Sequence, residues 1–190
     1  MNATAPISLA SNGTGSSGLA AFSLTGQSVL VTGQINNYAA PQFALASGEG
    51  VLTQLSPTLY SLDMGIIGPG GPPSLTSTLR LLNAAVGPAD TLAGAFAFSG
   101  VAFSFIGFSP FNGLAAGQPL DGLRIDFGVL AAGTFNGQIV LSPRSQNDGG
   151  FDGALGAVTI NITASAVPTP GAAAVLSLLG LAAGRRRRVS

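Results

Sequence analysis

The side chains that could do chemistry in this chain are few. The sequence has no histidine, cysteine or lysine, and its seven carboxylates stand singly between Glu49 and Asp152. The chain therefore lacks the usual general base, the thiolate nucleophile and the Schiff-base amine. No two carboxylates have a spacing that implies a shared site, although a pair could assemble in three dimensions, as in glycosidases. We expect no enzymatic activity, and a hydrolase is kept only as an alternative.

One local cluster of oxygen-bearing side chains lies within residues 147–153. Asn147, Asp148 and Asp152 alternate with glycines, which would let the chain bend around a calcium ion and its six to eight oxygen ligands. The same residue types are typical of a β-hairpin turn, because Asn, Asp and Gly accept positive φ and Asx-type hydrogen bonds. Their spacing fits no EF-hand loop, so the turn is the favoured interpretation and calcium the alternative. No cofactor is expected.

Short apolar runs separated by Gly, Ser, Thr, Asn and Pro make up most of the chain. In residues 123–127, Leu123, Ile125 and Phe127 would lie on one face of a strand, with Arg124 and Asp126 on the other. No helical period is visible before residue 172. Close spacing of short strands and turns predicts an all-β sandwich or barrel.

The charge balance bears on the class of partner. Four of the seven arginines end the chain at 185–188, and the remaining three arginines with seven carboxylates leave the preceding residues at a net charge of −4. Because nucleic-acid binding needs a basic face, we expect no nucleic-acid partner. Without cysteine the chain has no disulfide framework.

Two segments about 131 or 132 residues apart share a pattern of strand, polar turn and strand. They are residues 7–32 and residues 139–163. A tandem domain would give such a similarity, and two unrelated hairpins are the alternative. On the repeat interpretation, residues 1–35 are the C-terminal strands of a preceding copy, and Met1 lies downstream of the true start. That would also account for the absence of a signal peptide at the N-terminus.

The final segment, residues 167–190, carries a second kind of signal. Residues 172–184 are uncharged and rich in Ala and Leu, so a helix is expected after Pro170. It would be about 20 Å long, shorter than the roughly 30 Å hydrocarbon core, which leaves a buried helix with a basic tail as the alternative. By the positive-inside rule, the arginines would stay in the cytoplasm and the preceding residues would be exported. The membrane anchor would be formed by Ala172, Val175, Leu176, Leu178, Leu179 and Leu181, and transfer would be stopped by Arg185, Arg186, Arg187 and Arg188.

The order of Val167, Pro168, Thr169 and Pro170, an apolar run and an arginine cluster resembles the PEP-CTERM sorting signal of Gram-negative bacteria. The resemblance implies that an exosortase-type membrane protease recognises and cuts this segment. The family usually has glutamate where this chain has Thr169, so any contact with that carboxylate is lost. The implied location is an inner-membrane-inserted precursor that is exported to the cell envelope, surface or extracellular matrix.

The body, residues 36–166, resembles the choice-of-anchor D type of bacterial surface domain. The segments that carry the resemblance are residues 62–65, 81–92, 111–117 and 132–139. The resemblance implies an Ig-like Greek-key β-sandwich, here followed by a short transmembrane helix, and no known catalytic role. We expect a non-catalytic surface or matrix protein whose partners are the protease, the membrane, and exopolysaccharide or other surface proteins. A carbohydrate-binding or adhesive module is the alternative, and it requires exposed aromatic side chains.

Overall fold

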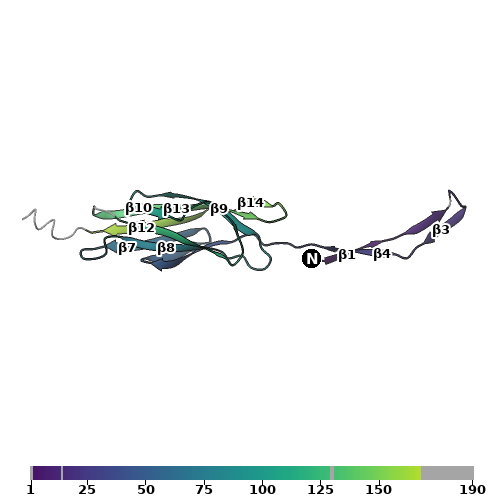
Figure 1. Cartoon of the computed structure of the whole chain (residues 1–190), viewed down its shortest axis with the longest axis horizontal. Coiled ribbons are helices and arrows are strands. Elements are labelled where there is room, and N and C mark those ends of the chain that lie inside the picture. Colours follow the sequence, from purple (N-terminus) through teal and green to yellow (C-terminus); the bar gives the residue numbers. More distant parts are fainter. Residues whose placement is uncertain (1, 14, 129–130, 168–190) are drawn as a thin grey trace, which may run out of the picture. The chain divides into compact units, whose positions relative to one another are not determined.

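The computed structural model describes residues 2–13, 15–128 and 131–167, and every regular element in these ranges is a β-strand (Figure 1). The all-β prediction is therefore confirmed. The described residues contain no helix that is long and apolar enough to cross a membrane. The helix expected at 172–184 and the arginines at 185–188 lie outside the described residues. The chain divides into two compact units, Met1–Asn36 and Asn37–Ser190.

The first sheet of the larger unit has four antiparallel strands in the order β10-β12-β8-β5. They are β5 (Pro41–Gly48), β8 (Leu75–Asn83), β10 (Phe103–Ile106) and β12 (Pro119–Phe127). Alternate residues of β8 are buried from Leu75 to Asn83, as a strand with one face on the core requires. In β12 the same alternation buries Leu123, Ile125 and Phe127, as their spacing predicts.

The second sheet has the order β11-β9-β13-β15-β7-β6, with β14 paired to β13. Its strands are β6 (Val51–Ser56), β7 (Leu59–Ile67), β9 (Thr91–Ser99), β11 (Phe111–Leu114), β13 (Gly133–Gln146), β14 (Asp152–Ala154) and β15 (Val158–Ala166). Only the pairing of β15 with β7 is parallel among these described strands. The two sheets pack face to face and form a β-sandwich.

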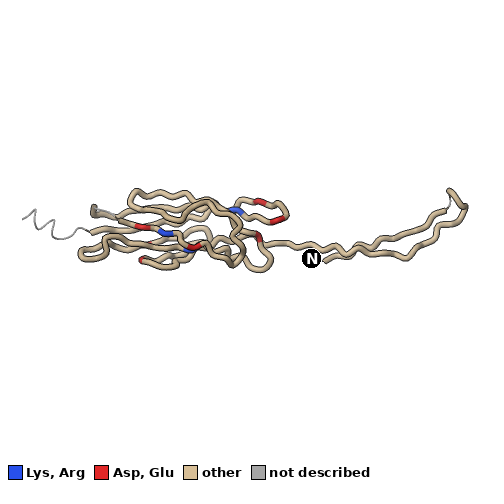
Figure 2. Tube along the Cα trace, viewed as in Figure 1, with Lys and Arg blue, Asp and Glu red and all other residues tan. Residues whose placement is uncertain are grey.

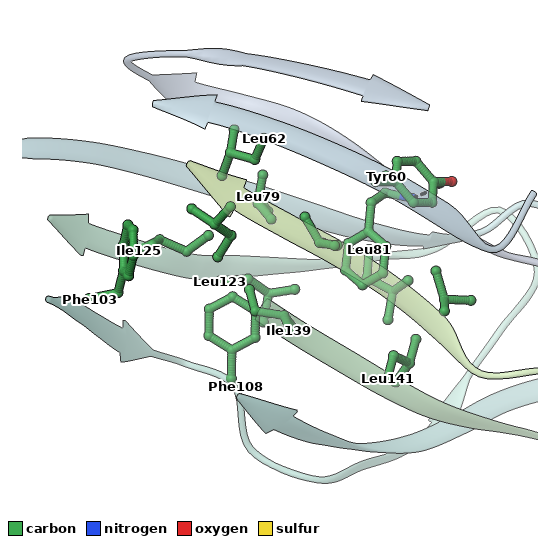
Figure 3. Packing of buried hydrophobic residues seen from close by; sticks show 14 of the residues in the cluster. Tyr60, Leu62, Leu79, Leu81, Phe103, Phe108, Leu123, Ile125, Ile139 and Leu141 are labelled. Carbon is green, nitrogen blue, oxygen red and sulfur yellow. Dashed lines mark hydrogen bonds between the residues drawn. The ribbon is translucent and has the colours of Figure 1, made fainter. Parts of the chain in front are cut away.

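Inward-facing side chains of the two sheets meet in one hydrophobic core (Figure 3). Leu79 and Leu81 of β8 and Leu123 and Ile125 of β12 are fully buried in it. From the other sheet the core receives Tyr60, Leu62, Ile139, Leu141, Ile160 and Ile162. Phe103 and Phe108 also belong to it, whereas Phe98 of the same aromatic-rich stretch is exposed. The aromatic residues of this stretch are therefore divided between the core and the surface.

The smaller unit is a long two-stranded ribbon (Figure 1). β1 (Asn2–Ile7) pairs with β4 (Gln27–Thr32), and β2 (Ala10–Gly13) pairs with β3 (Leu19–Ser23), all antiparallel. The turn is closed by backbone N–H groups of residues 16–18, which donate to the carbonyl of Gly13. Within this unit no second sheet covers the described strands, and its large apolar side chains are exposed: Ile7, Leu9, Leu19, Phe22, Leu24, Val29, Leu30, Val31 and Ile35.

Candidate functional site

A buried polar cluster lies at the end of the sandwich where residues 37–40 enter it. The Asp90 carboxylate is 2% exposed and accepts hydrogen bonds from Ser145 Oγ at 2.9 Å and from Asn147 Nδ2 at 3.1 Å. Ser145 Oγ in turn accepts a hydrogen bond from the backbone N–H of Ala39 at 2.9 Å. Through Ser145, the Asp90 carboxylate therefore connects the end of β13 to the segment 37–40.

Asn83, at the end of β8, extends this cluster on its other side. Its Oδ1 accepts from the N–H of Ala40 at 3.0 Å, and its Nδ2 donates to the carbonyls of Asp90 and Leu114, each at 3.1 Å. Every buried side-chain nitrogen or oxygen that the structure describes has a hydrogen-bond partner. The cluster is thus fully satisfied, which is the condition under which buried polar groups fix a structure rather than weaken it.

The segment proposed as a calcium site forms the turn between β13 and β14. Asn147 Oδ1 accepts from the N–H groups of Gly149 at 3.0 Å and Phe151 at 3.3 Å, an Asx-type arrangement. Asp152 Oδ1 accepts from Arg144 Nε at 2.7 Å. Across the described residues, no group of three or more acidic, histidine or cysteine side chains is placed to hold a metal ion. Turn geometry and an ion pair account for Asn147 and Asp152, and calcium binding by Asn147, Asp148 and Asp152 stays a prediction.

The other acidic residues are scattered over the larger unit (Figure 2): Asp121 and Asp126 lie on β12, Asp63 lies on β7, and Glu49 lies between β5 and β6. Asp121 pairs with Arg80 at 2.7 Å, and Asp126 with Arg124 at 2.7 Å. Burial raises the pKa of Asp126, but hydrogen bonds from Arg124 and Thr76 outweigh it and leave the pKa below its usual value. The hydrogen bond from Arg144 likewise lowers the pKa of Asp152. Asp126 and Asp152 are therefore ionised at neutral pH, unlike a general acid with a raised pKa.

An exposed pair of stacked aromatic rings stands beside the polar cluster. Tyr38 and Phe151 are 64% and 40% exposed, and their ring centroids lie 5.5 Å apart with an interplanar angle of 17°. Phe151 also lines a hollow of about 370 Å³, together with Thr91, Asn112, Gln146, Asn147, Asp148, Gly150 and Asp152. Aromatic faces next to amide and carboxylate groups offer both an apolar surface and hydrogen-bonding partners to a ligand.

A second hollow, of about 490 Å³, shares Asn112 and Gln146 with the first. Its lining is mainly apolar and includes Phe111, Pro143 and Leu155. The sequence did not single out Tyr38 or either hollow, because they depend on contacts between residues far apart in the chain. The only local signal was the cluster of Asn, Asp and Gly at 147–153, which indicates a turn.

The segment predicted for sorting begins where the described structure ends. Val167 follows β15, its N–H donates to the carbonyl of Ile67 at 3.0 Å, and its side chain is exposed. The rest of the predicted sorting, anchor and stop-transfer residues, from Pro168 to Arg188, lies outside the described residues.

No protein-family model matches the chain, and no curated protein matches it. Among solved structures, the chain is similar to the ASH / PapD-like domain of human CEP192 (PapD-like domain 7). Sequence identity is 12% and the TM-score 0.43, with 74% of this chain and 95% of that chain covered.

Ser145→Ala tests the role of the buried cluster. The change removes the hydroxyl that donates to Asp90 and accepts from Ala39, so it should lower the free energy of unfolding by about 1–3 kcal/mol. The exposed Ser142 lies on the same strand, and Ser142→Ala should change the free energy by less than about 0.5 kcal/mol. Urea unfolding followed by circular dichroism measures both, and equal losses would contradict the assignment.

Proposed function

We propose that this protein is an exported, non-catalytic surface or extracellular-matrix protein whose C-terminal segment retains the precursor in the membrane and is cut by an exosortase-type protease. The main observation in support of this proposal is that the folded domain ends where the predicted sorting segment begins. The last strand of the sandwich ends at Ala166, and the segment predicted for sorting starts at Val167. A protease acting after this point would release the folded domain intact.

The residues after Val167 suit this role physically. Pro168 and Pro170 disfavour a helical conformation in the residues before them, which leaves an extended peptide of the kind that proteases bind. In the proposal, residues 172–184 form a short membrane helix and the arginines at 185–188 hold its end in the cytoplasm. The preceding residues, which we take as an Ig-like Greek-key sandwich, carry a net charge of −4 and no cysteine, and they act outside the cell.

Mass spectrometry of the C-terminus tests the proposal in a Gram-negative host with and without an exosortase-type protease. We expect a mature form lacking residues 185–188 only when the protease is present. Thr169→Glu restores the residue usual in the family and should raise the processed fraction several-fold. Changing all four terminal arginines to alanine should reduce retention in the membrane fraction, whereas Arg80→Ala in the sandwich should not. Recovery of intact C-termini alone in the presence of the protease would contradict processing.

A second candidate function, a carbohydrate-binding or adhesive module, is supported by the exposed stack of Tyr38 and Phe151. The stack lies beside the hollow that contains Asn112, Asn147 and Asp148. A sugar ring has an apolar face, which can pack on aromatic side chains. Its hydroxyl groups can form hydrogen bonds with amide and carboxylate side chains. This function is compatible with export, because a surface or matrix protein meets exopolysaccharide.

Electrophoresis in gels that contain soluble bacterial exopolysaccharide tests this second function. The intact chain should migrate more slowly in such gels, and Tyr38→Ala and Phe151→Ala should each restore most of the free mobility. Phe98→Ala is the matched control, because Phe98 is an exposed aromatic residue that does not line this hollow. Equal retardation of all three variants would contradict the assignment of the site.

A further inference from the structure

We propose that the N-terminal ribbon, residues 2–32, completes a second β-sandwich whose remaining strands come from a body like residues 37–132 placed N-terminal to it. The ribbon would occupy the position that β13 and β15 hold in the larger unit. This inference concerns a docking surface and is independent of the sorting function proposed above.

One face of the ribbon is apolar. In β1 and β4, Ala5 pairs with Val29 and Ala3 with Val31, which places these side chains on the same face. Ile7, the last residue of β1, continues this face, because side chains two residues apart along a strand point the same way, and its partner Gln27 is the polar member of the face. Leu9 follows between β1 and β2. The other face is mostly polar and carries Asn2, Thr4, Ser28 and Thr32, with Pro6 and Leu30 as its apolar members. Such alternation is typical of a strand pair that packs one face on a core.

The apolar residues of the ribbon have counterparts in β13 and β15. An offset of 132 residues relates Ile7 and Leu9 to Ile139 and Leu141, and an offset of 131 relates Val29 and Val31 to Ile160 and Ile162. In the larger unit these four residues are at most 1% exposed. Their counterparts are exposed by 42% at Ile7, 40% at Leu9, 49% at Val29 and 53% at Val31. Residues that lie in the core of the larger unit thus have exposed counterparts in the ribbon.

Strand register in the two hairpins differs by two residues. Ile139 lies opposite Ile160, whereas Ile7 lies opposite Gln27 and Val29 lies opposite Ala5. Because side chains alternate with a period of two, a shift by two residues keeps every side chain on its own face. The apolar face of the ribbon is therefore the face that would point into a sandwich.

The structure of the larger unit shows what kind of partner covers such a face. There β13 pairs with β9, β15 pairs with β7, and side chains of β8 and β12 complete the core. A body of this kind supplies both the hydrogen bonds for the ribbon's edges and the apolar surface for its face. The first 48 residues contain no charged side chain, so a partner that binds through charge does not suit the ribbon. A second copy of this chain is disfavoured, because its sandwich already contains β13 and β15.

The test uses a fusion protein in which a second copy of residues 37–132 is joined to the N-terminus of the full chain. The ribbon then follows this added copy in the same way as residues 133–166 follow residues 37–132 in the larger unit. In the unmodified chain, thermolysin should cut within residues 2–35 rapidly, since a two-stranded ribbon is only marginally stable alone. In the fusion we expect the cutting rate there to fall at least tenfold.

Two matched variants separate docking from general effects on the ribbon. Val29→Asp places a charge on the apolar face and should abolish the protection in the fusion. Leu30→Asp, at the position that corresponds to the exposed Asn161, should keep it. Rapid cutting of the ribbon in the unmodified fusion, or equal effects of the two variants, would overturn the proposal. If the ribbon of the unmodified chain is already protected when the chain dimerises, a second copy covers the apolar face. That result would also overturn the proposal.

Discussion

Burial of alternate side chains between two sheets is the interaction on which the rest of this structure depends. The chain has no disulfide, and all three ion pairs of the described residues involve arginines that are about half exposed, where such pairs contribute little. Stability must therefore come from apolar area removed from water, about 25 cal/mol per Å². Leu79, Leu123, Ile139 and Ile160 illustrate this, since each is fully buried between the sheets.

A satisfied polar cluster defines one end of that core. Ser145 and Asn83 accept hydrogen bonds from the backbone N–H groups of Ala39 and Ala40, and Ser145 is itself held by Asp90. Residues 39 and 40 therefore have a fixed position on the sandwich. A buried carboxylate is costly unless its hydrogen bonds are made, and here the two oxygens of Asp90 accept from Ser145 and Asn147. The same end carries the Tyr38–Phe151 stack, so the polar cluster also positions the surface that is a candidate for carbohydrate binding.

The sequence was sufficient to predict what depends on local pattern. Alternation at Leu123, Ile125 and Phe127 predicted a strand and its buried face, and the close spacing of strands and turns predicted an all-β sandwich or barrel. It was not sufficient for Asp90 or Tyr38, because their partners are distant in the chain and single polar or aromatic residues carry no period. Phe98 follows the apolar alternation and is nonetheless 52% exposed, with its ring centroid 4.7 Å from that of Phe105. The sorting signal was read from residue order alone and remains a prediction.

Amide hydrogen exchange on the intact chain tests most directly the claim that covered faces stabilise this protein. The account predicts that amides of β8, β12, β13 and β15 exchange only on the timescale of global unfolding, whereas amides of β1 and β4 exchange at least a hundredfold faster. The ribbon and the β13–β15 hairpin have similar patterns of apolar residues, so a difference between them would be due to burial. Equal protection of the two hairpins in the monomeric chain would contradict the account.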